Sequence, residues 1–267
     1  MKIDREVLER QLKTRWAGRL IRQFDSIDST NLEAVRQFKE GAPHGTLVIA
    51  ESQAAGKGRL GRTWISPEGT GIWMSLLLKP ALAPWSASML TLVCAMAATR
   101  GIREAAGLKT QIKWPNDVVW NGKKLCGILT EMSTREQEIR YVVTGVGINV
   151  NMTEFPEQAG GQAVSLRQAL GHPVERETLI ARILEAFEAY YEVFEAAEDL
   201  SGLRDEYNRQ LVNLGRQVKV LDPMEPFQGE ALGIDCQGNL LVKMPDGSIR
   251  TIRSGEVSVR GIYGYAL

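Results

Sequence analysis

The feature that most constrains the fold of this chain is a glycine-rich, basic stretch between Gly56 and Arg62. It reads Gly-Lys-Gly-Arg-Leu-Gly-Arg, and Pro67, Gly69 and Gly71 follow soon after it. Glycine and proline at this density exclude a helix, so the stretch must be a loop between two other elements. Glycines bring backbone N–H groups close to a ligand, and the interleaved cations pair with carboxylates and phosphates. The sequence therefore predicts an anion-binding loop.

The same loop matches the Gly-x-Gly-x-x-Gly pattern of nucleotide-binding proteins, but its context differs from theirs. A dinucleotide fingerprint needs a helix that starts at the last glycine, whereas residues 64–67 read Trp-Ile-Ser-Pro. A kinase needs His-Arg-Asp and Asp-Phe-Gly downstream, and neither tripeptide occurs. Lys57 is followed by Gly58 rather than Ser or Thr, which excludes a Walker sequence. A solvated basic turn is the alternative, but it needs neither this much glycine nor the tryptophan that follows.

Composition indicates a globular protein without a global charge. The 267 residues are enough for one large and one small domain, and 44% are apolar. Lys plus Arg equals Asp plus Glu at 32 each, so no overall field attracts nucleic acid or an anionic membrane. No apolar run reaches membrane-spanning length, and charges interrupt residues 1–24 where a signal peptide would lie. We therefore expect a cytoplasmic protein that does not enter a membrane.

The few cysteines and histidines argue against disulfide or metal chemistry. Cys94, Cys126 and Cys236 are odd in number and widely spaced, which is typical of reduced thiols rather than a disulfide framework or a zinc site. His44 and His172 are the two histidines, so a histidine-based metal site or catalytic triad is not expected.

Hydrophobic spacing predicts a mixture of helices and strands up to about Asn213, followed by short strands alone. Expected helices cover residues 4–16, 86–106, 176–197 and 201–211. A further helix is expected to have Ser29 or Thr30 as its N-cap and to end at Gly41. Expected strands cover residues 46–51, 71–79, 110–114, 118–120, 124–132 and 140–149, with a hairpin turn at Asn121-Gly122. The later segments 218–221, 228–234, 240–244, 249–253 and 257–259 predict a small all-β barrel. We place the two domains at residues 1–213 and 214–267.

Five short motifs follow one another between residues 24 and 151. They are Asp28-Ser-Thr-Asn31; Gln53 to Arg62 with Trp64 and Ser66-Pro67; Lys113-Trp-Pro-Asn-Asp117; Lys124-Leu-Cys-Gly-Ile-Leu129; and Gly145-Val-Gly-Ile-Asn149. In this order and spacing they resemble the biotin protein ligase (biotin–[acetyl-CoA-carboxylase] ligase) family, in its form without an N-terminal helix-turn-helix domain. Two positions depart from the family pattern: Lys57 stands where arginine is usual, and Cys126 where alanine is common. Lysine keeps the charge but loses the bidentate fork of arginine.

The resemblance implies a fold and a reaction. The fold is α+β: a catalytic domain with a mixed β-sheet flanked by helices, like class II aminoacyl-tRNA synthetases and the biotin–lipoate ligases, and a small C-terminal SH3-like β-barrel. In the reaction, the biotin carboxylate attacks the α-phosphate of ATP, which is bound with Mg²⁺, and gives biotinyl-5′-AMP and pyrophosphate. A lysine of a biotin carboxyl carrier protein, from acetyl-CoA carboxylase or a related carboxylase, then takes the biotin. A homodimer is implied by family habit.

The resemblance also assigns catalytic roles to Lys124 and Arg59. Two like charges about 4 Å apart repel by about 4 kcal/mol at an effective dielectric of about 20, so a cation between carboxylate and phosphate removes much of the barrier. Lys124 is expected to be that cation, although by itself a lysine beside Asn121-Gly122 would be interpreted as an exposed hairpin charge. Arg59, with Lys57 and the Gly58 backbone, is expected to bind the activated carboxylate and phosphate.

The remaining site residues are assigned in the same way. Ser29, Thr30 and Asn31 at a helix start, with Gln53 at a strand end, are expected to bind the ureido ring of biotin, whereas the plain alternative is helix capping alone. ATP and the adenylate are expected to contact Arg62, Trp64, Asn116 and Asn149.

For several of these residues the alternatives stay open. Trp64 would close over the adenylate, although a tryptophan more often lies in the core, and Asn116 and Asn149 could equally be turn residues. Trp114-Pro115 is expected to shape the pocket floor. Lys113 and Asp117 are either a structural ion pair or a link to phosphate and Mg²⁺.

Two other functions compete with this interpretation. A lipoate protein ligase would share the architecture and the adenylation chemistry, but the basic loop and the Lys-Trp-Pro-Asn-Asp motif favour biotin. A biotin-responsive transcriptional regulator would need a DNA-binding domain, and residues 1–24 are too short for a helix-turn-helix. We therefore expect an enzyme that does not bind DNA.

Overall fold

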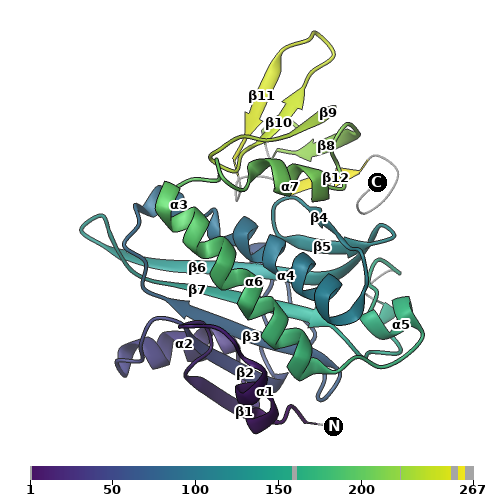
Figure 1. The fold of residues 1–267 in the computed structure, drawn as a ribbon. Helices are drawn as coiled ribbons and strands as arrows, with labels where there is room; N and C mark the ends of the chain where they lie inside the picture. The colour runs from purple at the N-terminus through teal and green to yellow at the C-terminus, as the bar shows by residue number, and fades with distance from the viewer. Residues whose placement is uncertain (1, 158–160, 223, 254–257, 262–267) are drawn as a thin grey trace.

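A seven-stranded mixed sheet forms the centre of the larger part of the molecule (Figure 1). The structure is a computed structural model that describes residues 2–157, 161–222, 224–253 and 258–261. The strand order is β1-β2-β3-β7-β6-β5-β4; β1 pairs with β2 in parallel and the other pairs are antiparallel. The strands are β1 (Ile21–Ile27), β2 (Thr46–Gln53), β3 (Gly71–Leu78), β4 (Gln111–Lys113), β5 (Asp117–Trp120), β6 (Lys123–Arg135) and β7 (Glu138–Asn149).

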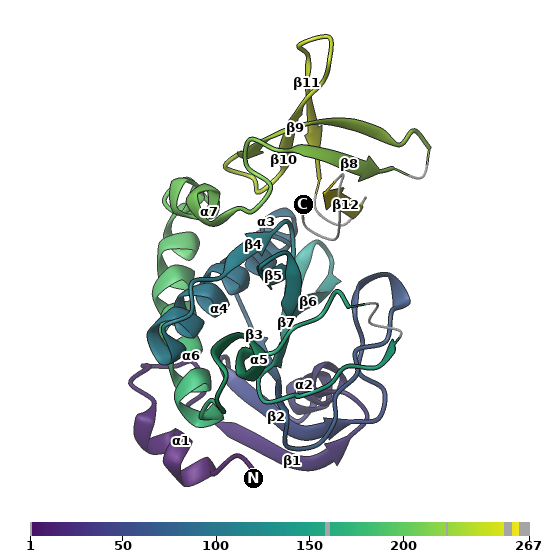
Figure 2. The same ribbon diagram turned by 90° about the vertical axis from the view of Figure 1, so that its right-hand side faces the viewer.

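Helices cover the two faces of this sheet unequally (Figure 2). The long helices α4 (Leu90–Ala106) and α6 (Arg176–Ala197) pack on one face, and α2 (Thr30–Lys39) packs on the other. Helix α4 is apolar on nearly every side, because it lies between the sheet and α6. The shorter helices are α1 (Arg5–Gln11), α3 (Pro84–Ala87), α5 (Leu166–Leu170), α7 (Arg204–Gln210) and the 3₁₀ turn η1 (Arg59–Gly61).

The alternation of side chains along β7 separates a packed face from an open one. Val146 and Ile148 belong to the main hydrophobic core, which α4 shares, and Val143 belongs to a second cluster with residues of α2. Between Val143 and the end of the strand, the positions on the α2 face are Gly145 and Gly147. These two positions of β7 have no side chains, which leaves an open space between this face of the sheet and α2.

The C-terminal part forms a separate antiparallel sheet. Its strand order is β11-β10-β9-β8-β12, and it stands above the β4 end of the large sheet (Figure 1). The buried indole of Trp114 donates a hydrogen bond of 3.0 Å to the Gly238 carbonyl, so the two parts are directly connected. The strands are β8 (Gln217–Leu221), β9 (Phe227–Ile234), β10 (Leu240–Lys243), β11 (Ile249–Ile252) and β12 (Ser258–Gly261).

The predicted fold class is confirmed: a mixed sheet with flanking helices precedes a small β domain. The predicted boundary between residues 213 and 214 stays a prediction. One end of the predicted strand 257–259 lies outside the described residues, since Val257 is not among them.

Several predicted element boundaries differ from the structure. The expected helix 86–106 is two helices, α3 and α4. The expected helix 4–16 ends at Gln11, because Leu12 is extended and the N–H groups of Arg15, Trp16 and Ala17 donate to the Glu188 carboxylate of α6. That partner is more than 170 residues away, so local spacing could not reveal it.

Candidate active site

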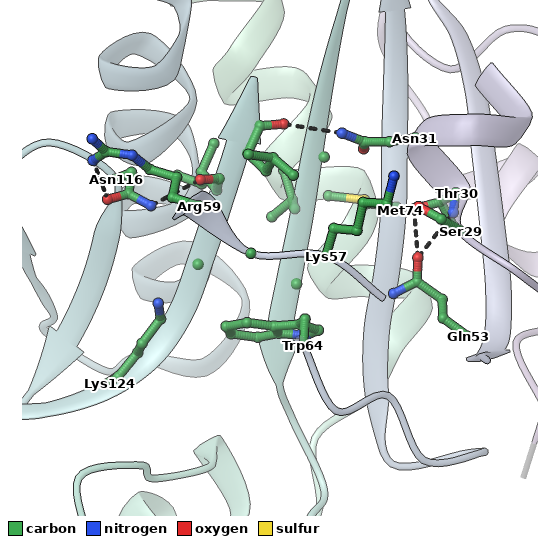
Figure 3. Close-up of a pocket in the computed structure, with 17 residues that line it drawn as sticks. Ser29, Thr30, Asn31, Gln53, Lys57, Arg59, Trp64, Met74, Asn116 and Lys124 are labelled. Atoms are coloured by element: carbon green, nitrogen blue, oxygen red, sulfur yellow. Dashed lines mark hydrogen bonds between the residues drawn. The ribbon is translucent and has the colours of Figure 1, made fainter. Parts of the chain in front are cut away.

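A pocket lies on the α2 face of the large sheet, over the glycine-rich part of β7 (Figure 3). It encloses about 450 Å³ of open space, part of which communicates with solvent. Four of the five sequence motifs described above supply most of its lining, and the motif Lys113-Trp-Pro-Asn-Asp117 contributes Asn116 alone. The lining residues are Ser29, Thr30, Asn31, Gln53, Lys57, Gly58, Arg59, Trp64, Met74, Asn116, Lys124, Gly127, Ile128, Leu129, Gly145, Val146 and Gly147.

One end of the pocket is a fixed array of uncharged polar groups. Gln53 Oε1 accepts hydrogen bonds from the Thr30 N–H (2.9 Å) and Thr30 Oγ1 (3.1 Å). Ser75 Oγ, fully buried on β3, lies 2.7 Å from Thr30 Oγ1 and 2.6 Å from Asn31 Oδ1. Ser29 is the N-cap of α2, yet its side chain makes no capping hydrogen bond. Capping alone therefore does not explain this serine, and its neighbours are oriented by one another.

Asn31 reaches across to the neighbouring strands. Its Nδ2 donates to Glu131 Oε2 (2.6 Å) and to the Leu129 carbonyl (3.3 Å) on β6. A Cβ atom at Gly145 would lie 2.1 Å from Asn31 Oδ1, so any side chain at Gly145 would displace the amide. The glycine at this position is therefore required by the orientation of Asn31.

The opposite end of the pocket is cationic. Arg59 and Lys124 line it, and Arg59 Nη1 donates to Asn116 Oδ1 at 3.0 Å, whereas Lys57 extends from the loop toward Met74 and Thr30 (Figure 3). Asn116 is itself held by the Ile128 carbonyl, to which its Nδ2 donates at 3.0 Å. Burial lowers the pKa of the Arg59 guanidinium, although it stays fully charged at neutral pH. A bound anion would offset the cost of this partly buried charge.

Lys124 points into the pocket because of a β-bulge. Val119 pairs with Lys124, but the preceding residue of β5, Val118, pairs with Cys126, so Leu125 is an extra residue on β6. The bulge places Lys124 and Gly127 on the same face, although they are three residues apart. A Cβ at Gly127 would lie 3.0 Å from Lys124 Cε. The Lys124 backbone is fixed separately, by the Gln162 carbonyl (2.7 Å) and the Val164 N–H (2.9 Å).

Trp64 lies between the two ends, on the glycine floor (Figure 3). A Cβ at Gly147 would lie 2.5 Å from its ring, and one at Gly127 would lie 2.7 Å from it. Lys124 Nζ is 5.1 Å from the ring centroid, which is a cation–π distance. The indole N–H is buried and has no hydrogen-bond partner among the described residues. Trp64 is thus a wall of the pocket rather than a core residue.

Two predicted site residues lie outside this lining. Arg62 is exposed, and its backbone carbonyl accepts from the Gly58 N–H, which closes the turn of the basic loop. Asn149 is buried and donates to the Val164 carbonyl at 3.2 Å and to the Lys124 carbonyl at 3.5 Å. Their expected contacts with ATP stay predictions.

The expectation that Trp114 shapes the pocket floor is wrong. Trp114 is fully buried and faces the C-terminal sheet, while Gly127, Gly145 and Gly147 form the floor. Sequence reasoning also missed Ser75 and Met74 as neighbours of the site, because neither belongs to a polar motif. The alternation of β3 opposite the glycines of β7 is the signal that could have placed Ser75 on this face.

This arrangement suits a ligand with a neutral polar head and an anionic tail. The polar array and the cationic end lie at opposite ends of one pocket, with an indole and a bare sheet between them (Figure 3). Among the described residues no group of three or more His, Cys, Asp and Glu side chains could hold a metal ion.

Comparisons with known proteins agree with these features. Residues 23–149 match the Biotin/lipoate A/B protein ligase family, and residues 214–260 match the Biotin protein ligase C terminal domain. The Bifunctional ligase/repressor BirA of Bacillus subtilis (strain 168) is 40% identical over 250 residues, which are 93% of this chain and 76% of that protein. The Biotin–[acetyl-CoA-carboxylase] ligase of Paracoccus denitrificans is 31% identical, over 88% of this chain and 98% of its own length.

A solved structure shows the same fold. The biotin protein ligase from Aquifex aeolicus in complex with biotin and ATP superposes with a TM-score of 0.80 and 29% sequence identity. The superposition covers 91% of this chain and 99% of that chain.

Proposed function

This chain belongs to the biotin protein ligase family and is a ligase, and we propose that its pocket activates biotin with ATP and passes it to a lysine of a carrier protein. The observation that carries this proposal is the position of Lys124 and Arg59 in the same pocket as the polar array around Thr30 and Gln53. The relatives named above are biotin ligases, which favours biotin over lipoate.

Biotin is proposed to lie along the glycine floor. Its ureido ring needs several hydrogen-bond partners, and Ser29, Thr30, Asn31 and Gln53 offer donors and acceptors at the polar end. Its aliphatic chain would pass Trp64 and the bare strands, which offer apolar surface without side chains in the way. This direction brings the biotin carboxylate to the cationic end.

In the first step a carboxylate oxygen of biotin attacks the α-phosphorus of ATP, and pyrophosphate leaves with the electron pair of the broken P–O bond. Both reactants are anionic, so their approach is opposed by charge repulsion. Lys124 Nζ is proposed to lie between them and to stabilise the charge that builds up on the phosphorus. Arg59 and Lys57 are proposed to hold the remaining oxygens.

In the second step the lysine amine of the carrier attacks the acyl carbon of biotinyl-5′-AMP. The bond to the phosphate oxygen breaks, AMP leaves, and the amine loses a proton as the amide forms. Lys124 can polarise the acyl oxygen in this step too, and Trp64 can keep water from the anhydride. Arg59 is proposed to retain the intermediate until the carrier arrives.

Mg²⁺ is proposed to enter with ATP as part of the substrate. Mg²⁺ is usually held by one or two carboxylates together with phosphates and water. The carboxylate nearest to Lys124 is that of Asp117, which already lies 2.6 Å from Lys124 Nζ and 3.8 Å from Lys113 Nζ. Asp117 is therefore already engaged by two cations, and the phosphates of ATP are proposed to supply the protein-independent ligands of the ion.

The partners are proposed on the same basis. The acceptor is a biotin carboxyl carrier protein of acetyl-CoA carboxylase or of a related carboxylase, as the name of the Paracoccus relative indicates for that protein. Three expectations stay predictions: the homodimer, the cytoplasmic location and the absence of DNA binding. The relative from Bacillus subtilis is named a bifunctional ligase/repressor, so membership of the family does not decide whether this chain binds DNA. Within the described chain, no helix has both the length and the apolar character needed to cross a membrane.

The test is the variant Lys124→Ala. Loss of one charge-stabilising group should lower adenylate formation more than about a hundredfold, or about 3 kcal/mol. Pyrophosphate release with biotin and ATP measures this step without a carrier, and replacing biotin by lipoate tests the rival substrate. The exposed neighbour Lys123→Ala is the matched control and should keep the parent rate. A folded Lys124→Ala variant that loses less than about fivefold would contradict the assignment.

A further inference from the structure

Three charged side chains form a row across three neighbouring strands beside the pocket. Lys113 lies on β4, Asp117 on β5 and Lys124 on β6. Asp117 Oδ1 is 2.6 Å from Lys124 Nζ, and Asp117 Oδ2 is 3.8 Å from Lys113 Nζ. The side chains of Lys113 and Asp117 are each 7% exposed, whereas that of Lys124 is 26% exposed. Only the last of the three thus reaches the open part of the pocket.

The row follows from strand register. Lys113 and Asp117 are directly opposite each other in the β4–β5 pair, so their side chains share a face. Asp117 is opposite Gly127 on β6, and the bulge at Leu125 brings Lys124 to that same face. Since Gly127 has no side chain, the Lys124 ammonium can cross over it to the Asp117 carboxylate.

A long lysine side chain needs an anchor to hold its ammonium at one point. Lysine has four rotatable bonds, and an ammonium held at one point loses most of that rotamer freedom. A buried carboxylate 2.6 Å away fixes the ammonium before substrate binds, which reduces the reorganisation needed during the reaction.

An anchoring carboxylate has a disadvantage, because it cancels the charge that it holds. Asp117 and Lys124 together are neutral, and a neutral pair would attract the biotin carboxylate and the α-phosphate weakly. Lys113 adds a second positive charge on the far side of Asp117, so the row of three carries a net charge of about +1. Lys113 is too buried to contact substrate itself.

We propose that Asp117 is a positioning residue that aims Lys124 at the reacting oxygens, and that Lys113 offsets the Asp117 charge so that Lys124 remains an effective cation. The proposal rests on the role given to Lys124 above. It assigns Lys113 and Asp117 to the reaction, whereas a merely structural ion pair would only stabilise β4 and β5.

The experiment is a mutant cycle on the complete chain, read by pyrophosphate release and by thermal unfolding. Asp117→Asn is nearly isosteric and removes the anchor; we expect kcat to fall about 10- to 100-fold while KM for biotin changes less than about threefold. In a Lys124→Met background the same substitution should cost less than about twofold, since there is no longer an ammonium to position. If Asp117 only stabilised the fold, Asp117→Asn would lower the unfolding temperature and would change the rate by the same factor in both backgrounds.

Lys113 is tested by two substitutions. Lys113→Met should raise KM for ATP about tenfold, and Lys113→Arg, which keeps the charge, should stay within about threefold of the parent. The effect of Lys113→Met should disappear when Asp117 is Asn, because there is then no carboxylate charge to offset. Lys123→Met, which removes an exposed lysine on the same strand as Lys124, is the matched control.

The outcomes separate this proposal from the one on which it rests. If Lys124→Met keeps the parent rate, the proposed function of Lys124 is wrong and the positioning role falls with it. If Lys124→Met is slow but Asp117→Asn is as fast as the parent, or its loss is the same in both backgrounds, the positioning role alone is overturned. A Lys113→Met variant with an unchanged KM for ATP overturns the role of Lys113.

Discussion

Arg59 is proposed to retain the reaction intermediate, whereas the charge stabilisation during its formation is assigned to Lys124. It reaches the pocket from the basic loop and is held by Asn116, so its guanidinium is in place in the same pocket as Lys124 before an anion binds. A charge-assisted hydrogen bond to a charged ligand contributes about 1.5–3 kcal/mol. Loss of Arg59 should therefore release biotinyl-5′-AMP faster while Lys124 still supports its synthesis.

The prediction for Arg59→Gly is that the variant biotinylates bystander lysines as well as its carrier. The off-rate of the adenylate should rise by one to two decades, in line with about 1.5–3 kcal/mol. Incubation with biotin, ATP and albumin, followed by a mass-spectrometric count of modified albumin sites, measures the escape. If the variant labels albumin no more than the parent enzyme does, Trp64 or the Gly58 backbone retains the intermediate instead.

Cys126, one of the two departures from the family pattern, lies in the hydrophobic core. Its side chain is fully buried in the core on the α4 side of β6, so it faces away from the pocket. Burial raises the pKa of its thiol well above the usual value, so the sulfur stays neutral and unreactive. The other departure, Lys57, is exposed and lies at the pocket.

At the scale of single residues, the sequence motifs identified side chains that line the pocket, but they did not identify the side chains that orient them. Lys124, Arg59 and Thr30 belong to recognisable motifs and do line the pocket. Ser75 looks like any serine in an apolar strand, and its contact with Asn31 joins residues 44 positions apart. Such a contact depends on the packing of α2 on β3, which no local pattern encodes.

The basic loop is the element whose behaviour should change most with ligand. It turns back on itself, with Gly58 N–H bonded to the Arg62 carbonyl and an isolated bridge between Lys57 and Thr63. At its tip Leu60 is 68% exposed and has a left-handed φ of 57°. An exposed apolar tip between cations gains little from packing until an anion is present.

We therefore predict that biotin plus ATP slows amide hydrogen exchange in the loop from Gln53 to Gly69. The charges of both ligands should pair with Lys57 and Arg59 and hold the loop against the pocket. Exchange measured by mass spectrometry, with and without ligands, gives the comparison, and the central amides of α6, which packs on α4 at the other face of the sheet, serve as an internal reference that should not change. Equal exchange of the loop in both states would count against this.

Element prediction failed where distant pairing overrides local preference. Strand β1 was missed because Ile-Arg-Gln-Phe-Asp-Ser-Ile shows no clean alternation, and it is a strand because it pairs in parallel with β2 at the sheet edge. The helix expected over residues 86–106 is divided at Ser88 and Met89, where the backbone hydrogen bonds span three residues instead of four. By contrast α6 was placed correctly, since a 22-residue helix has a long and regular apolar pattern.

At the scale of the whole molecule, a buried ion pair joins segments from both ends of the catalytic part. Arg176 of α6 and Glu51 of β2 are 4% and 1% exposed and meet at 2.9 Å. Arg176 also donates to the Gly71 carbonyl at the start of β3, and Glu51 accepts from the Ile3 N–H at 2.6 Å. The pair thus ties the N-terminal segment and α6 to the two strands that flank the basic loop.

The prediction for Arg176→Met is a large loss of stability, because it leaves the Glu51 carboxylate buried without its cation. Removing one partner of a buried pair costs about 3–5 kcal/mol. Urea unfolding monitored by circular dichroism gives the free energy, and the exposed Arg135→Met, whose ion pair lies in solvent, should change it little. A loss below about 1 kcal/mol would show that water or other groups reach Glu51.

The bulge at Leu125 has a consequence for anyone who redesigns this sheet. A straightened β6 would continue the alternation of Cys126 and Ile128, and Lys124 would then project among the apolar side chains under α4. Idealised backbones are usually built to remove such irregularities, on the assumption that they are defects. Here a more regular strand would keep the sequence of the motif unchanged and still turn the proposed catalytic lysine away from the pocket, because its direction depends on one extra residue of backbone.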